Sequence, residues 1–365
     1  MAIEFVGMIF PSQWSETRGV RSGTLDLDYL RYHSRAHENA GFDRVLIASG
    51  PGGADSLQIA AFAAAQTERL GFMIAHRPGL WAPTAAARAF ATLDQTTGGR
   101  IRLHAITGIT AEPQEGDYLE DKAERYARTD EYLQIVKKTW TSEEPFDFEG
   151  RYYQIKDAFS PVKPLQKPLI PISFGGASPA AYDVGVRHAD LYGIWGEPLS
   201  DAKEHIATIR NAAEKAGVPA PRISLSVRLI VGATEELAWQ RAENILAQIK
   251  QNPIYQPGSA WSKRQTSVAG KRLLAAAERA DRHDRALWMP TATAVGAYGD
   301  TTALVGTPET VVASLLDYVD LGVTTFLNRG YDPLYDTVDY GRWIIPAVQE
   351  EVARRAAAGT SRAAA

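Results

Sequence analysis

Short apolar runs that alternate with helical patterns constrain this chain more than any other feature of its sequence. Eight runs are typical of strands, and most are followed by a stretch with helical spacing of apolar residues. The expected strands are residues 3–10, 43–48, 70–75, 101–107, 168–174, 190–195, 223–231 and 324–330. The expected helices are 25–40, 55–67, 84–97, 121–140, 178–188, 201–216, 235–247, 307–321 and 339–355. Because each parallel crossover needs a connection as long as a helix, this alternation predicts parallel strands.

Eight such units close into a (β/α)8 barrel, also called a TIM barrel, and this is the α/β fold that we predict. The alternative is an open, doubly wound sheet. That fold normally carries a glycine-rich fingerprint after its first strand, and residues 11–24 contain no GxGxxG. We expect one barrel over residues 1–352 and a tail at 353–365 that frays from a helix into disorder.

Two segments interrupt the alternation. Residues 146–155 predict a short hairpin with its turn at Glu149 and Gly150. Residues 248–295 have no strand period and follow the seventh strand, so we expect them to leave the barrel at the carboxyl ends of the strands, where active sites of this fold lie. This insertion is our candidate lid, and its basic residues are Lys263, Arg264, Lys271 and Arg272.

Composition excludes several kinds of function. The chain has 39 Lys and Arg against 43 Asp and Glu, so no basic excess exists to neutralise a nucleic-acid backbone. It has no cysteine, which excludes disulfides, thiolate metal sites and a cysteine nucleophile. No apolar stretch approaches ~20 residues, so we expect no membrane span. The first residues are typical of a strand rather than a signal peptide, and we expect a cytoplasmic protein.

Two strand ends could contact a phosphorylated or aromatic ligand. SFGGASPAA (173–181) is a strand, then Gly176, Ala177 and Ser178, then a helix start, which allows close backbone approach and favours a phosphate. A plain strand-to-helix turn explains the same residues. Thr107, in AITG (105–108), could bond a cofactor or simply the backbone.

The later strands supply further candidates. Trp195 could wall an aromatic ligand or only pack at the rim. Ser226 and Arg228 share one face of a strand, and a buried Arg needs an anionic partner, either a structural carboxylate or an anionic substrate. Tyr331 follows the last strand and could donate a proton.

Histidines give no metal signature. His33 and His37 lie four residues apart on one expected helix, but no HExxH motif or third ligand accompanies them. We expect this pair on a solvated helix face.

An ordered series of segments resembles the bacterial luciferase-like superfamily, and most closely the flavin-dependent alkanesulfonate monooxygenases. The resemblance covers roughly residues 4–347. The segments are RPGLWAPTAAARAFATLDQTTGGR (77–100), ITG (106–108), ERY (124–126), FDFEGRYY (146–153), FGGAS (174–178), IWGEP (194–198), TALVGTPETV (302–311) and LNRGY (327–331).

This resemblance implies a two-component monooxygenase. Reduced FMN would be supplied by a separate NAD(P)H-dependent flavin reductase and would bind at the barrel mouth. It would react with O2 through a C4a-(hydro)peroxyflavin to oxygenate a small organic molecule. Sulfonates and other organosulfur compounds are the candidate substrates. The resemblance also implies a homodimer or homotetramer.

The resemblance assigns residues as well. It implies that His104 and Thr107 lie near the flavin ring, and His104 replaces a family Asn. Tyr126, Ala177 and Ser178 match phosphate-binding positions. Trp195 and Tyr331 match active-site aromatic residues. From the strand pattern we add Arg228 and Ser226 to the catalytic candidates, with Arg228 offsetting negative charge.

Departures from the family pattern concern the polar residues that face the substrate. The alkanesulfonate enzymes carry an Arg-x-His pair where this chain has Ser226, Val227 and Arg228. A family lid Arg aligns with Ala297, a His with Gln13, and a Cys with Gly53. Two other functions are therefore considered: deazaflavin-dependent hydride transfer, since related barrels bind that cofactor, and flavin binding without catalysis.

Overall fold

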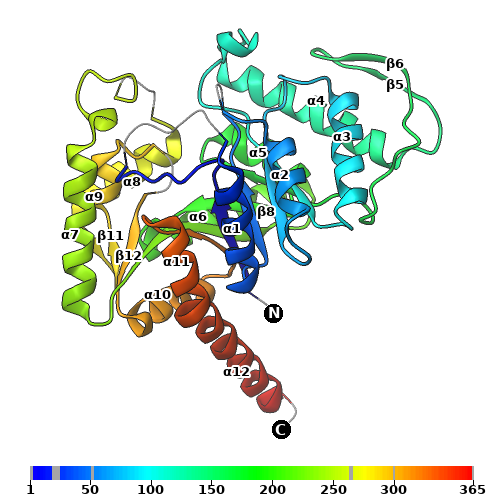
Figure 1. Ribbon diagram of the computed structural model, residues 1–365. Coiled ribbons are helices and arrows are strands. Elements are labelled where there is room, and N and C mark those ends of the chain that lie inside the picture. The colour runs from blue at the N-terminus through cyan, green and yellow to red at the C-terminus, as the bar shows by residue number, and fades with distance from the viewer. Residues whose placement is uncertain (1–2, 19–24, 51–52, 263–265, 299–300, 364–365) are drawn as a thin grey trace. The chain divides into compact units, whose positions relative to one another are not determined.

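The computed structural model describes residues 3–18, 25–50, 53–262, 266–298 and 301–363 (Figure 1). Eight parallel strands form a closed barrel with helices around it, which confirms the predicted fold. In the sheet the order runs from β9 through β13, β1, β2, β3, β4 and β7 to β8, and β8 pairs again with β9. These strands are β1 (Glu4–Ile9), β2 (Arg44–Ile47), β3 (Gly71–His76), β4 (Ile101–Ala105), β7 (Ile172–Gly175), β8 (Leu191–Trp195), β9 (Arg222–Val231) and β13 (Val323–Arg329).

The chain divides into two compact units that share β2 and β8. Unit 1 comprises Met1–Val45, Gly193–Thr208 and Arg222–Ala365, and unit 2 comprises Leu46–Tyr192 and Ile209–Pro221. The helix α6 (Leu199–Ala216) contributes to both units.

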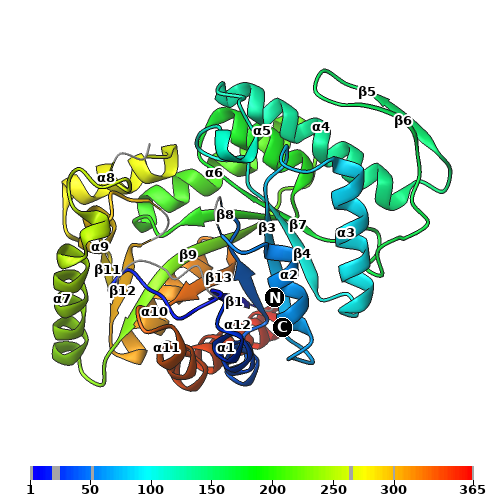
Figure 2. The ribbon, with the colours of Figure 1, turned by 45° about the horizontal axis from the view of Figure 1, so that its top comes forward.

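In unit 1, β13 lies between β1 and β9. Phe5 is opposite Phe326, and Leu327 is opposite Ser226, so the carboxyl ends of these strands meet at one edge. The helices are α1 (Leu27–Asn39), α7 (Glu235–Gln251), α10 (Pro308–Asp320), α11 (Pro333–Asp339), the π-helix η3 (Tyr340–Ile344) and α12 (Ile345–Ala363). Figure 2 shows α1 beside α11. The helix α12 extends well into the segment where we expected a fraying tail.

The insertion after β9 contains ordered elements that the sequence pattern missed. They are the 3-10 turn η2 (Pro253–Tyr255), α8 (Val268–Arg279), β10 (Arg282–His283), β11 (Leu287–Trp288) and α9 (Pro290–Ala294). The strand β12 (Ala303–Gly306), which was also missed, follows the insertion. The strand β12 runs parallel to the last residues of β9, with Ala303 opposite Arg228, and β11 and β10 extend the sheet in antiparallel fashion. Lys263 and Arg264 lie outside the described residues.

Unit 2 contains β3, β4 and β7 with their helices. These are α2 (Ser56–Ala64), α3 (Pro83–Thr96), the 3-10 turn η1 (Pro113–Glu115), α4 (Lys122–Thr141) and α5 (Pro179–His188). The predicted hairpin is present as β5 (Phe146–Glu149) and β6 (Gln154–Ala158). The helix α4 has one buried face, which Thr129, Leu133, Val136 and Trp140 form at spacings of three and four residues.

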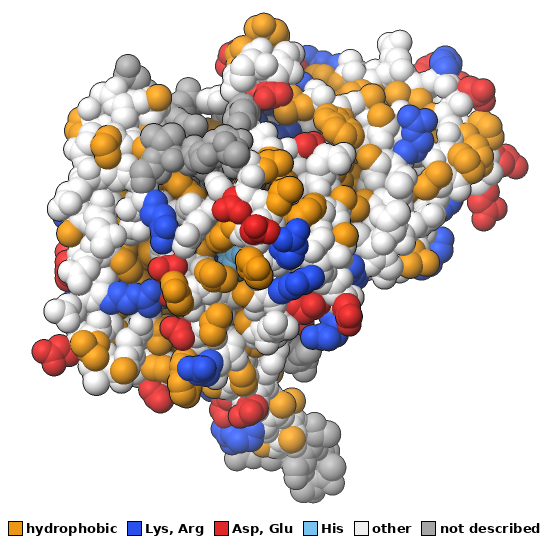
Figure 3. Space-filling view, in the orientation of Figure 1, with side chains coloured by type: hydrophobic (Ala, Val, Ile, Leu, Met, Phe, Trp, Pro, Cys, Tyr) orange, Lys and Arg blue, Asp and Glu red, His pale blue; other side chains and the backbone are white. Residues whose placement is uncertain are grey.

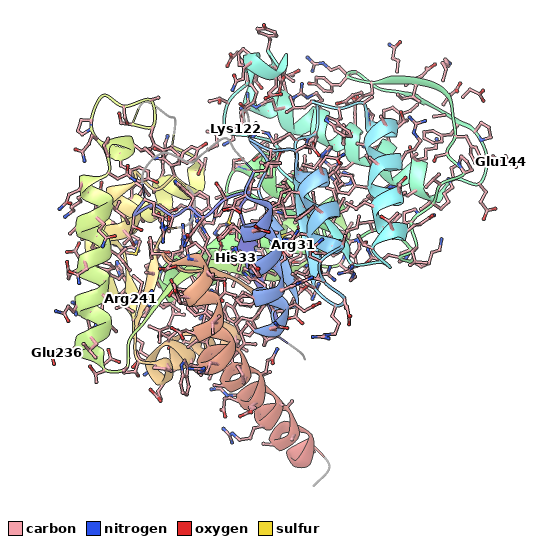
Figure 4. The ribbon with its side chains drawn as sticks, in the orientation of Figure 1. Arg31, His33, Lys122, Glu144, Glu236 and Arg241 are labelled. Carbon is pink, nitrogen blue, oxygen red and sulfur yellow. The ribbon has the colours of Figure 1, made fainter. Side chains whose placement is uncertain are left out.

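The prediction of a solvated face for His33 and His37 is wrong. Both side chains are buried on the face of α1 that packs against α11, and Figure 4 labels His33 there. The Nε2 atom of His33 lies 3.1 Å from the carbonyl oxygen of Pro333, and that of His37 lies 3.3 Å from Oγ1 of Thr337. Burial lowers the pKa of His37 to about 4, so the pair is neutral at pH 7.

Charged side chains of both signs alternate with apolar ones on the face that Figure 3 shows. Within the described ranges, no helix has both the length and the apolar character that crossing a bilayer requires.

Candidate functional site

In unit 2, the loop between β7 and α5 forms a small backbone cradle. Ser178 caps α5, its Oγ accepting from the N–H of Ala181 at 3.3 Å, and it also shares a hydrogen bond with the hydroxyl of Tyr126. Gly176 has a φ of +144°, and a Cβ there would lie 2.7 Å from the Cβ of Ala181 and 3.1 Å from the Tyr126 hydroxyl. Tyr192 donates to the Gly176 carbonyl at 3.0 Å.

This cradle fits a phosphate group. The loop offers the hydroxyls of Tyr126 and Ser178 and, because Pro179 has no N–H, the backbone N–H of Ala180 at the start of α5, while the absence of a side chain at position 176 keeps the backbone accessible. The structure therefore brings together four of the predicted cofactor residues, Tyr126, Gly176, Ala177 and Ser178, because Ala177 lies between the glycine and the cap.

Thr107 follows β4 and is buried against α4. Its Oγ1 lies 3.2 Å from Oγ1 of Thr129, which itself donates to the carbonyl of Arg125 at 2.9 Å. Since Thr129 has only one hydroxyl proton, Thr107 must be the donor to Thr129. The remaining lone pairs of Thr107 can then accept from a ligand N–H.

His104 lies on β4, with its Nδ1 2.9 Å from the hydroxyl of Ser173 on the neighbouring β7. Burial, together with the positive charge of Arg102, lowers its pKa to about 4. The imidazole is therefore neutral at pH 7 and can offer one donor and one acceptor.

Arg125 is a residue of this region that the sequence interpretation missed. Its side chain is fully buried, and its guanidinium donates to the carbonyls of Ile109, Leu119 and Glu120. It fixes both ends of the loop that follows Thr107. Arg125 is the middle residue of the ERY segment, which the sequence analysis singled out. Its three carbonyl partners, however, could not be predicted from the sequence, because they depend on how the loop folds.

In unit 1, Trp195 and Ser226 come together at the ends of neighbouring strands. The N–H of Gly196 donates to the carbonyl of Ser226 at 2.8 Å, and both Trp195 and Ser226 are half-buried. A Cβ at Gly196 would lie 2.5 Å from Oγ1 of Thr302, so glycine is required for this approach.

Arg228 is fully buried, and its carboxylate partner is Glu16, in the loop after β1. Its Nη2 lies 2.6 Å from Oε1 of Glu16. Arg329, at the end of β13, donates to the same oxygen at 2.7 Å. One buried guanidinium, that of Arg228, and one half-buried guanidinium, that of Arg329, therefore share one carboxylate.

The carboxylate of Glu16 is stabilised in its charged form. Burial alone would raise its pKa, but Arg228 and Arg329 outweigh that effect and lower the pKa to about 2. Glu16 is therefore an anion over the physiological range rather than a proton donor. The loop that carries it is tied to the insertion, because Asn252 donates to the carbonyls of Glu16 and Arg18 at 3.0 and 2.6 Å.

Tyr331 is buried beside this cluster. The guanidinium carbon of Arg228 lies 5.1 Å from the centre of its ring, and its hydroxyl donates to the carbonyl of Thr301 at 3.3 Å. Burial raises the pKa of Tyr331 to about 12, so the phenol keeps its proton. The role of Tyr331 as a proton donor to a substrate stays a prediction, and it would require the bond to Thr301 to open.

Glu16 and Arg329 were not among the predicted site residues. The need of Arg228 for an anion was recognised, and the barrel order offers a further signal. Because β13 lies between β9 and β1, an acidic residue just after β1 or β13 is a natural partner. Glu16 and Asp332 both meet that condition, and of the two only Glu16 is buried.

The remaining predicted positions lie in varied surroundings. Arg272 of the insertion forms a bidentate pair with the buried Glu197, at 2.7 and 2.6 Å, and so fixes α8 to the loop that follows Trp195. Gln13 and Gly53 are exposed, whereas Ala297 is buried with a φ of +50°.

Comparison with known proteins agrees with this architecture. The family model described as luciferase-like monooxygenase matches residues 4–325. Among solved structures, a riboflavin lyase with modified FMN and riboflavin is 20% identical at a TM-score of 0.78, covering 96% of this chain and 92% of its own. EDTA monooxygenase from Chelativorans sp. BNC1 is 18% identical at 0.75, covering 96% and 94%.

A third similar structure is an F420-dependent secondary alcohol dehydrogenase in complex with an F420-acetone adduct. It is 18% identical at a TM-score of 0.68, covering 95% of this chain and 99% of its own. Similarity at this level of identity establishes the shared barrel fold. The match of the family model over most of the chain shows that this protein belongs to the luciferase-like monooxygenase family.

Proposed function

We propose that the protein is a flavin-dependent monooxygenase that receives reduced FMN from a separate NAD(P)H-dependent reductase and oxygenates a small organic substrate. The cradle at Gly176 is the observation that carries the proposal, because it is a backbone shape that only glycine permits. Family membership supports it. When bound, the reduced flavin supplies the electrons that activate O2.

In this proposal each predicted residue has a stated task. Tyr126, Gly176, Ala177 and Ser178 hold the FMN phosphate, and Thr107 accepts a hydrogen bond from an N–H of the ring. His104 contacts the ring as a neutral imidazole. Trp195 contacts the ring or the substrate and excludes water, with Ser226 beside it.

The substrate that we propose is an organic anion, and sulfonates and other organosulfur acids are the candidates. Arg228 is fully buried, and it contacts both the carboxylate of Glu16 and the ring of Tyr331. In this proposal Arg228 offsets negative charge on the substrate, and Tyr331 orients it.

The test supplies photoreduced FMN and O2 with a panel of sulfonates, sulfones and small carboxylic acids. We expect substrate-dependent oxygen consumption, one atom of 18O2 in the product and, for a sulfonate, release of sulfite. Replacement of Arg228 by Ala should reduce turnover of anionic substrates. Oxygen consumption that no substrate changes, without labelled product, would reject the proposal. Light scattering after chromatography tests the accompanying proposal of a homodimer or homotetramer.

The second candidate is deazaflavin-dependent hydride transfer, favoured by the similarity to the F420-dependent alcohol dehydrogenase. It predicts anaerobic, substrate-dependent oxidation or reduction of F420 and no incorporation of oxygen. The same substrate panel, run with each cofactor with and without O2, separates the two functions.

A further inference from the structure

A cavity within unit 1 lies beside Tyr331, but none of its other lining residues has a task in the proposed reaction. It is bounded by α7 and by the loops that follow β1 and β13, and its volume is about 420 Å³. This is within the size range of sites that hold small molecules. Tyr331 contributes to its wall, but the hydroxyl of that residue is directed to the carbonyl of Thr301.

The α7 wall carries three primary amides in a row. Gln240, Asn244 and Gln248 are spaced by four residues, so they lie on one face of the helix, and all three are exposed and line the cavity. Within the described chain no hydrogen bond occupies these amides. Each amide both donates and accepts, a pattern that suits hydroxyl groups.

The opposite wall carries one charge of each sign. Arg18 and Asp332 are 3.9 Å apart, and their side chains are 44% and 37% exposed. A contact this long and this exposed is weak, so both groups remain available to a ligand. The second guanidinium of the wall, that of Arg241, is committed to Asp336 and to the carbonyl of Val231, and Figure 4 shows Arg241 on the side of α7 that faces α11.

We propose that this cavity binds a small polyhydroxylated organic acid of the sugar-acid class. Arg18 would take the carboxylate through paired hydrogen bonds, and the amide row together with Asp332 would take the hydroxyls. Leu237 and Ile245 provide only a narrow apolar strip. An alkyl acid would cover the amides without bonding them, which is unfavourable.

Three probes of similar length separate the two recognition elements. D-gluconate has the carboxylate and the hydroxyls, sorbitol has only the hydroxyls, and hexanoate has only the carboxylate. Saturation-transfer NMR titrations on the full chain without flavin should give gluconate the highest affinity, with sorbitol about tenfold weaker and hexanoate weaker still. Because the assay contains neither flavin nor O2, its result is independent of the proposed monooxygenase activity.

Matched variants locate the site. Gln248→Leu should weaken gluconate binding roughly two- to tenfold, whereas Gln251→Leu, on the same helix but outside the cavity, should leave it unchanged. Arg18→Gln should reduce the preference for gluconate over sorbitol. Equal binding of hexanoate and gluconate, equal effects of the two glutamine variants, or no binding of gluconate would each overturn the proposal.

Discussion

Replacing Glu16 by Gln tests whether the buried charge cluster of unit 1 has been understood. The substitution keeps the shape and one acceptor oxygen, but it removes the charge of the carboxylate that Arg228 and Arg329 both contact. Removing one partner of a buried ion pair costs about 3–5 kcal/mol, and the retained oxygen favours the lower end.

The pKa of Glu16 gives a second estimate of the same quantity. It falls from 4.5 to about 2, and one unit corresponds to about 1.4 kcal/mol, so the charged form contributes roughly 3 kcal/mol to stability. Because the folded-state pKa is depressed, this contribution is fully present above pH 4.5 and is lost as the pH falls towards 2. The cost of breaking a buried ion pair and the pKa shift of Glu16 therefore give similar values for its contribution to stability.

Urea unfolding followed by fluorescence measures the effect at pH 7 and at steps down to pH 3. We expect Glu16→Gln to lose about 3 kcal/mol at pH 7 and part of the pH dependence below 4.5. Glu351→Gln is the matched control, since the pKa of Glu351 is also lowered to about 2, by Arg354 and Arg355, but on a fully exposed surface. Equal behaviour of the two variants would refute the reasoning.

Three further predictions address other parts of the chain. Gly176→Ala should weaken FMN binding at least tenfold in a fluorescence titration, because the new Cβ would lie 2.7 Å from the Cβ of Ala181. The circular dichroism spectrum should stay unchanged. Unchanged FMN affinity would show that the cradle is not the binding site. Arg272→Met should make limited proteolysis of the insertion faster, because it leaves the buried Glu197 without its bidentate partner. An unchanged proteolysis rate would mean that contacts other than this ion pair fix α8. Burial lowers the pKa of His37 to about 4, so its contribution to stability is present above pH 6.5 and is lost as the pH falls towards 4. In urea titrations, His37→Gln should reduce the dependence of the unfolding free energy on pH in this range. An unaltered pH dependence would contradict the burial of His37.

The barrel could be predicted from sequence because its strands are long enough to carry a pattern. The strands β10 and β11 of the insertion could not be predicted, since they have two residues each and no period can be recognised in them. The His33 and His37 prediction failed for a different reason. The residues that bury them, Pro333 and Thr337, lie about 300 positions away, so helical spacing alone gave no information about that face.

The same distinction applies to the candidate residues of each unit. The cradle in unit 2 depends on a local requirement, a glycine followed by a helix cap, and such requirements leave a motif in the sequence. The Arg228 cluster depends on Glu16, 212 positions earlier, so its net charge cannot be obtained from any segment. The fold and the glycine loop are therefore what the sequence of this chain predicts, whereas the contacts of Glu16 with Arg228 and Arg329 emerge only from the folded structure.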